Sequence, residues 1–206
     1  MTRRLESSPR TIAELVVQLG RITHGHGYTE GLTPAQWSAL RYLSRANRFS
    51  RTVSAFAEFH ATTRGTASQT VKCLVAQGYL SRTRSPRDGR SACLEVTDNA
   101  RAILARDPCE ALVRAASALP PSVRDRLATG LERLLGHLVQ GRRKRPFGVC
   151  TSCAHLEVAG WRREGEPRFK CAFFGELLEE TELAQICINF QPGKDSAMKR
   201  AFRGQA

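Results

Sequence analysis

The residues best suited to chemistry are four cysteines in the last third of the 206-residue chain. Cys150 and Cys153 form a CxxC pair, and Cys171 and Cys187 follow as single residues after gaps of 17 and 15 residues. The polar start of the chain shows no signal peptide, and no stretch is long and apolar enough to cross a membrane. We therefore expect a cytoplasmic protein whose thiols stay reduced, so cysteines this close in sequence predict a metal site rather than disulfides.

The spacing of the cysteines bears on which metal they bind. Structural zinc usually takes its ligands from two close pairs, because each pair presents two thiolates to a small tetrahedral ion. Here only the first pair is close, and we expect Cys187 on a helix over Glu179–Ile188. Scattered ligands favour an iron–sulfur cluster, and structural zinc is the alternative. The spacing resembles that of high-potential iron–sulfur proteins, in spacing alone, and His155 is expected to support the ligands rather than to be one.

The net charge of +13 is unevenly distributed along the chain. Residues 1–145 hold 24 Lys and Arg against 11 Asp and Glu, residues 146–193 hold 4 against 7, and residues 194–206 hold 4 against 1. A basic excess confined to one part of a chain is typical of a nucleic-acid-binding surface. The cysteine-containing part is acidic, so we do not expect it to contact DNA.

A polar-faced helix is predicted over Thr63–Gln77. Val71, Leu74 and Val75 recur at helical spacing and predict an inward face. Gly78 ends the helix, because glycine adopts the left-handed conformation without strain. The opposite face carries hydroxyls, an amide and cations that suit phosphates and base edges in a major groove; they are Thr63, Arg64, Thr66, Ser68, Gln69 and Lys72.

A β-hairpin is predicted directly after this helix. Its strands are Ser81–Arg84 and Ala92–Thr97, joined by a turn containing Pro86, Asp88 and Gly89. The arginines at its tip and base suit a wing that contacts the neighbouring minor groove; they are Arg82, Arg84, Arg87 and Arg90.

Helices are predicted on both sides of this helix-hairpin unit. Thr11–Ile22 has an apolar stripe, Thr33 and Pro34 start a helix with core residues including Trp37, and Ser50–His60 predicts a supporting helix. Residues 98–140 are helical again, broken at residues 119–122, with a leucine stripe after the break.

Three stretches together resemble the MarR (multiple antibiotic resistance regulator) family of dimeric winged helix-turn-helix repressors. They are Leu32–Leu43, the helix TRGTASQTVKCLVAQGYL, and the wing RDGR followed by LEVTDNAR. The resemblance covers about residues 10–140. It implies a homodimer on a pseudo-palindromic double-stranded DNA operator, with dimerisation through the terminal helices. It also implies that Arg64, Ser68, Gln69 and Lys72 face the major groove, that Arg90 enters the minor groove, and that Asp88 positions the tip arginines.

The expected fold is mainly α with a small β-wing, followed by a small four-cysteine module. The predicted parts are residues 1–140 (winged helix and dimerisation), 141–146 (basic linker), 147–193 (metal-binding module) and 194–206 (basic tail). The predicted function is a transcriptional regulator, not an enzyme, whose iron–sulfur cluster senses redox state, oxygen or iron and acts by moving the module against the dimer helices. Two alternatives remain: a structural zinc site with a small molecule sensed in the dimer cleft, and a redox or electron-transfer protein.

Overall fold

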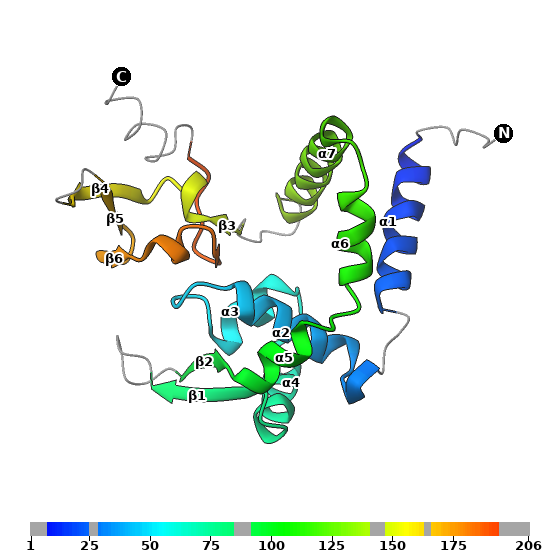
Figure 1. The fold of residues 1–206 in the computed structure, drawn as a ribbon, viewed down its shortest axis with the longest axis horizontal. Coiled ribbons are helices and arrows are strands. Elements are labelled where there is room, and N and C mark those ends of the chain that lie inside the picture. The colour runs from blue at the N-terminus through cyan, green and yellow to red at the C-terminus, as the bar shows by residue number, and fades with distance from the viewer. Residues whose placement is uncertain (1–7, 25–28, 85–91, 141–146, 163–165, 194–206) are drawn as a thin grey trace.

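The computed structural model describes residues 8–24, 29–84, 92–140, 147–162 and 166–193, without the side chains of residues 139 and 140. Two hydrophobic cores organise these residues. The larger core lies in the winged helix, and the smaller one lies in the module that contains the four cysteines. In the view of Figure 1 the module and the group α1, α6 and α7 stand on opposite sides of the upper half of the molecule, above the winged helix.

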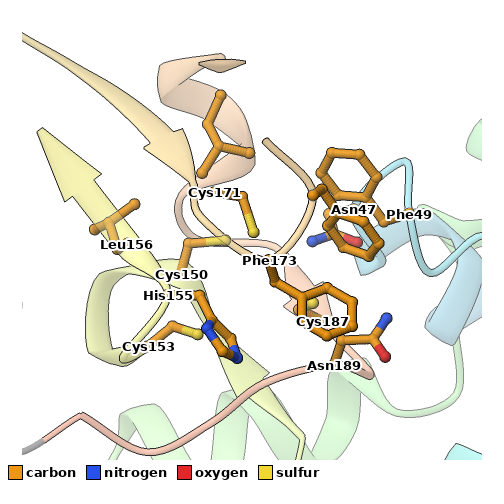
Figure 2. A pocket seen from close by; sticks show the side chains of 12 residues that line it. Asn47, Phe49, Cys150, Cys153, His155, Leu156, Cys171, Phe173, Cys187 and Asn189 are labelled. Atoms are coloured by element: carbon orange, nitrogen blue, oxygen red, sulfur yellow. The ribbon is translucent and has the colours of Figure 1, made fainter. Parts of the chain in front are cut away.

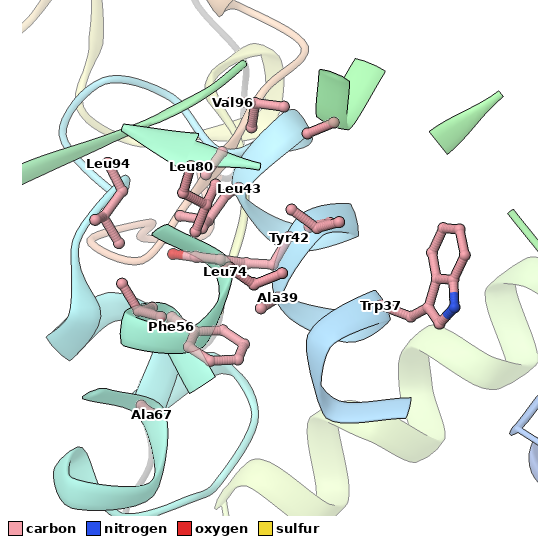
Figure 3. Close-up of a cluster of buried hydrophobic side chains, with 14 of the residues drawn as sticks. Trp37, Ala39, Tyr42, Leu43, Phe56, Ala67, Leu74, Leu80, Leu94 and Val96 are labelled. Atoms are coloured by element: carbon pink, nitrogen blue, oxygen red, sulfur yellow. The ribbon is translucent and has the colours of Figure 1, made fainter. Parts of the chain in front are cut away.

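The winged helix is built from four helices and one hairpin. These are α2 (Pro34–Arg45), α3 (Val53–Phe59), α4 (Arg64–Ala76), β1 (Leu80–Arg84), β2 (Ala92–Val96) and α5 (Asp98–Leu104). Leu43, Leu74, Leu80 and Leu94 are at most 2% exposed and lie together in its core (Figure 3), and Trp37, 2% exposed, belongs to the same hydrophobic cluster. The predicted winged-helix elements are therefore confirmed.

Local capping explains why these helices start and end where they do. Thr33 caps α2 in a capping box with Gln36, and Pro34 occupies the first turn. Thr63 caps α4, whose end is followed by Gly78 at φ 73°. The glycine stop read from the sequence is thus confirmed, because only glycine adopts this angle without strain.

Helix α3 begins three residues later than the predicted start at Ser50. Thr52 caps it, with its side chain accepting a hydrogen bond from the backbone N–H of Ala55. Ser50 is fully buried in the loop before α3, where its Oγ accepts a hydrogen bond from the backbone N–H of Ile188 at 3.0 Å. A contact with a residue 138 positions away keeps Ser50 out of the helix.

In the described residues three helices lie outside the winged-helix core: α1 (Pro9–His24), α6 (Glu110–Ser117) and α7 (Pro121–Gln140), with a short 3₁₀ turn at Thr29–Gly31. A further break precedes α6, because Asp107, 7% exposed, lies 2.8 Å from Arg41 Nε and accepts from the Cys109 N–H. Among the described residues, no helix is long and apolar enough to span a membrane.

The module is a small β structure. Strand β3 (Gly148–Val149) pairs with β7 (Ile186–Cys187), and β4 (Leu156–Trp161), β5 (Pro167–Cys171) and β6 (Glu176–Leu178) form an antiparallel sheet. Short 3₁₀ turns lie at Cys150–Ser152 and Glu180–Glu182.

The helix predicted over Glu179–Ile188 is wrong. The chain there forms one 3₁₀ turn and then β7, because Cys187 pairs with Gly148 and Ile186 pairs with Val149. The Ile186 carbonyl and the Ile188 N–H also bond the winged helix. These non-local bonds use the backbone groups that a helix would have required.

Candidate functional site

The four cysteines of the module line a single pocket (Figure 2). The remaining lining residues are mostly apolar or aromatic; they are Asn47, Phe49, His155, Leu156, Phe173, Phe174, Leu178 and Asn189. The structure therefore brings together all four thiols that the sequence selected, and it adds residues from the winged helix.

Three short backbone features hold the cysteines in place. Cys150 begins a 3₁₀ turn and Cys153 follows it, and the Cys153 N–H donates to the Cys150 carbonyl at 3.0 Å. Cys171 ends β5, and Cys187 sits in β7 opposite Gly148. A Cβ at position 148 would lie 2.8 Å from Phe190 Cζ, so glycine is needed there for the ring to close over the strand pair.

Burial and the neighbouring cysteines raise the pKa values of two of these thiols. All four cysteines are between 6% and 9% exposed. Burial, together with the neighbouring Cys187, Cys153 and Cys171, raises the pKa of Cys150 to about 12. Burial also raises the pKa of Cys171, although hydrogen bonds from the backbone N–H groups of Phe174 and Phe173 oppose that rise. Four thiolates can share this pocket only with a positively charged group among them.

Within the part of the chain that the structure describes, no group of three or more His, Cys, Asp or Glu side chains is placed to hold a single metal ion. A zinc ion requires thiolates at about 2.3 Å from one centre. The donors are four soft sulfurs in a mostly apolar shell, a set whose chemistry suits a thiolate-bound metal or an iron–sulfur group.

His155 lines the pocket half-buried, with its ring 5.3 Å from that of Phe173. A supporting role for His155 stays a prediction.

The module docks on the loop Ala46–Arg51, which joins α2 to α3. The Asn47 N–H donates to the Ile186 carbonyl at 2.9 Å, and the Phe49 ring stacks on Phe174 with centroids 4.0 Å apart. Ile188 packs into the winged-helix core, and Phe49 packs into the core of the module. Each core thus includes a side chain from the other part.

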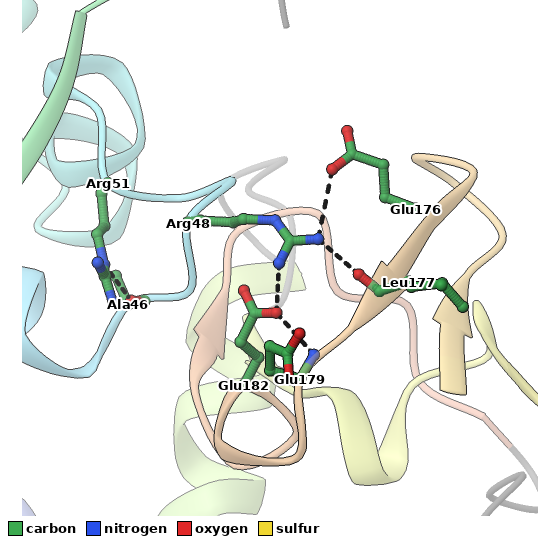
Figure 4. A network of polar contacts seen from close by, with 7 residues as sticks. All are labelled: Ala46, Arg48, Arg51, Glu176, Leu177, Glu179 and Glu182. Atoms are coloured by element: carbon green, nitrogen blue, oxygen red, sulfur yellow. Dashed lines mark hydrogen bonds and ion pairs between the residues drawn. The ribbon is translucent and has the colours of Figure 1, made fainter. Parts of the chain in front are cut away.

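Arg48 adds an electrostatic contact to this docking (Figure 4). Its guanidinium pairs with Glu182 and with Glu176 and donates to the Leu177 carbonyl at 2.6 Å. Glu182 is nearly buried and also accepts from the Glu179 N–H at 2.9 Å. Part of the acidic excess of the module is therefore directed at a cation of the winged helix.

The opposite side of the same loop contacts the wing. The Leu94 N–H in β2 donates to the Arg51 carbonyl at 2.8 Å, and Arg51 Nη1 lies 2.7 Å from Glu95. The Tyr42 hydroxyl of α2 donates to the Ser50 carbonyl at 2.9 Å. The loop thus joins the cysteine pocket to β2 within one chain. Sequence reasoning missed it, because nothing in Ala46–Arg51 indicates a partner more than 130 residues away.

The predicted DNA-contacting residues on α4 are accessible. Arg64, Gln69 and Lys72 are exposed and Ser68 is half-buried. Thr63 is exposed but its hydroxyl serves as the helix cap, and Arg64 Nε donates to Ser54 Oγ of α3 at 3.0 Å.

In the wing, Arg84 is exposed at the end of β1. The predicted residues Arg87, Asp88 and Arg90 lie outside the described residues, as does the basic linker over residues 141–146.

The sequence profile described as MarR family matches residues 30–91. The transcriptional repressor CouR, solved with a 23-mer DNA duplex, is 26% identical, with a TM-score of 0.50 over 65% of this chain and 99% of that chain. The described part of residues 30–91 has a winged-helix fold, and the sequence of this segment matches the MarR family profile. This supports the resemblance noted above for that part of the chain.

Two further solved structures share the MarR fold. MepR from Staphylococcus aureus, solved in a DNA complex, is 15% identical, with a TM-score of 0.53 over 66% of this chain and 99% of that chain. A MarR/EmrR family regulator from Acinetobacter sp. ADP1 is 18% identical, with a TM-score of 0.53 over 64% of this chain and 96% of that chain. About a third of the present chain has no counterpart in these structures. The search of curated proteins found no match to this chain.

Proposed function

We propose that this protein is a MarR-type transcriptional regulator that binds double-stranded DNA through α4 and the wing. The observation that carries the proposal is the exposed face of α4, on which Arg64, Gln69 and Lys72 are accessible and no acid lies between them. The related repressor CouR was solved on a DNA duplex, and MepR was solved in a DNA complex. The basic charge of residues 1–145 supplies the attraction to phosphate.

The functional unit in this proposal is a homodimer. Helices α1 and α7 leave large apolar side chains between 38% and 56% exposed; they are Ile12, Leu15, Val16, Val17, Leu19, Ile22, Val123, Leu127, Leu134, Leu135 and Leu138. Two amphipathic helices with their apolar sides open to water fit a second copy of the same chain. A two-fold dimer would place two copies of α4 in successive major grooves.

The pocket is the second part of the proposal: Cys150, Cys153, Cys171 and Cys187 hold an iron–sulfur cluster. The support is a donor set of four buried sulfurs around one space, shielded by Phe49, Phe173 and Phe174. When bound, such a cluster supplies a centre that responds to oxygen, iron supply or electron transfer. The residues of this chain exclude water from it and connect it to the loop Ala46–Arg51.

Control of DNA binding would pass through that loop rather than through the dimer helices. In the described residues the backbone hydrogen bonds and ion pairs cited above between the module and the winged helix are made with Ala46–Arg51, whereas Phe147 packs on Phe59 of α3 and Ile188 packs in the winged-helix core. The same loop bonds β2 through Leu94 and Glu95. A bound group changes DNA affinity only as far as it favours one arrangement of these contacts over another.

The test combines metal analysis with DNA binding. The protein is purified without air, analysed for iron, sulfide and zinc, and then used to select binding sites from random duplexes. We expect iron and sulfide with a broad absorption band near roughly 400 nm, specific binding to a pseudo-palindrome, and an affinity that changes when the cluster is removed. Colourless protein with one zinc ion would replace the cluster by a structural zinc site, and reductant-dependent turnover without specific DNA binding would overturn the regulator.

A further inference from the structure

Asn47 is a buried polar residue whose side chain lacks hydrogen-bond partners. It is 0% exposed, and neither its Nδ2 nor its Oδ1 has a partner. It belongs to the winged helix, yet it lines the cysteine pocket. Figure 2 shows its amide facing the same space as the sulfur atoms of the four cysteines.

An amide in this position destabilises the protein unless something in the pocket bonds to it. Buried polar groups in native proteins are nearly always paired, and a leucine of similar size would fill the same space without the cost of desolvation. The backbone of Asn47 is fixed by its N–H bond to the Ile186 carbonyl, and Ser50, three residues on, is fixed by the Ile188 N–H. The side chain is therefore held where it is, and its partner must come from the contents of the pocket.

The chemistry of the lining residues identifies that partner. Four cysteine sulfurs surround the space, so any group they hold presents electron-rich sulfur toward Asn47. Such a surface accepts hydrogen bonds, and the Nδ2 of an amide donates them. We propose that Asn47 Nδ2 donates a hydrogen bond to the sulfur-ligated group in the pocket and is the winged-helix residue through which occupancy of the pocket reaches the wing.

This inference rests on the proposed function and adds a residue to it. Asn47 holds the module in two ways, by its backbone bond to Ile186, next to Cys187, and by its side chain toward the bound group. The loop continues from Asn47 to Arg51, whose carbonyl accepts from the Leu94 N–H of β2. Filling the pocket gives Asn47 its missing partner and so changes the preferred position of a loop that the wing strand shares.

The experiment compares wild-type protein with Asn47→Leu and Asn47→Asp. Each is stripped of metal, then reconstituted without air with ferrous iron and sulfide. Asn47→Leu removes the unpaired amide, so the stripped protein melts at a higher temperature than stripped wild type, whereas the reconstituted variant loses its visible absorption in air several-fold faster. Its cluster also has a lower midpoint potential, because hydrogen bonds to sulfur stabilise the reduced state. Asn47→Asp removes the donor and adds a negative charge, so it reduces iron uptake further.

DNA binding measures whether occupancy of the pocket affects the wing. On a duplex selected by wild-type protein, the affinities of stripped and reconstituted wild type should differ at least about fivefold, the lower end of usual coupling. In Asn47→Leu this ratio falls below about twofold. Asn99→Leu, at an exposed position of α5, is the matched control and keeps the wild-type ratio, cluster lifetime and potential.

The outcomes distinguish failure of the cluster from failure of the role of Asn47. Wild type that takes up no iron and sulfide refutes the cluster itself. If wild type takes up iron and sulfide, the role of Asn47 alone is refuted when Asn47→Leu matches wild type in three properties. These are the cluster lifetime, the midpoint potential and the ratio of DNA affinities between stripped and reconstituted protein. A stripped Asn47→Leu variant that melts below wild type also counts against it, because the amide would then have a partner within the protein.

Discussion

The contact of Arg48 with the module can be tested by replacing Arg48 with methionine, which keeps the aliphatic stem but removes the guanidinium. The change breaks the ion pairs with Glu182 and Glu176 and the bond to the Leu177 carbonyl. We expect the module to detach more readily while the winged helix stays folded, because the core of the winged helix does not include Arg48.

The magnitude follows from the burial of the partners. A hydrogen bond to a charged group contributes about 1.5–3 kcal/mol. The side chain of Glu182 is 10% exposed and that of Arg48 is 34% exposed, so the pair is partly screened. Glu176 is 37% exposed and adds little. We therefore expect Arg48→Met to weaken the docking of the module by about 2 kcal/mol.

Hydrogen exchange reports this docking directly. The N–H groups of Asn47 and Ile188 are bonded across the contact and exchange when the module opens. A loss of about 2 kcal/mol corresponds to exchange about 30-fold faster at these two amides. The control is Arg101→Met, which removes an exposed pair with Asp98 on α5 and should leave both amides unchanged.

The result that would refute this reasoning is exchange at Asn47 and Ile188 that stays within about twofold of wild type in Arg48→Met. The ion pair would then contribute nothing to docking. A double-mutant cycle with Glu182→Gln checks the same point, because a real pair gives a coupling energy and two independent residues do not.

Three further predictions address the metal, the DNA and the dimer. Cys171→Ser should abolish iron retention, measured by metal analysis, without loss of the dimer in light scattering; stoichiometric iron in the variant would exclude a four-thiolate site. Lys72→Ala on α4 should reduce the slope of log affinity against log salt by about one, whereas Lys170→Ala on the module should leave it unchanged; equal slopes would remove α4 from the phosphate contacts. Leu135→Glu, at a 50% exposed position of α7, should weaken dimerisation by at least about 100-fold in sedimentation, and an unaltered dimer would place the interface elsewhere.

Local signals explain why the winged helix could be predicted from the sequence. Thr33 with Pro34, and Thr63 with Gly78, specify helix ends through contacts within a few residues. The hairpin strands likewise follow from neighbouring residues, and Leu80 pairs with Val96 at its base. Elements stabilised by near neighbours leave a pattern in the sequence, and these elements lie where that pattern placed them.

Elements held by distant partners left no such pattern. The helix expected over Glu179–Ile188 is replaced by a strand because Cys187 pairs with Gly148, and Ser50 is kept out of α3 by Ile188. Cysteine spacing alone selected the four thiols that share the pocket. It gave no indication of Asn47, because an asparagine in a loop is ordinary until its burial and its lack of partners are known.

The position of the docking loop also decides whether control of DNA binding would act within one subunit or between the two subunits of a dimer. Ser50 accepts from Ile188 through its side chain and from the Tyr42 hydroxyl through its carbonyl, so a shift of the module strand is resisted by α2. Arg51 transmits the remaining displacement to Leu94 and Glu95 in β2. These contacts lie within one chain, so each pocket would act on the wing of its own subunit. Occupancy of the pocket would then change how strongly each subunit contacts its own half-site. The distance between the two recognition helices would be set separately, by the dimer contacts of α1 and α7.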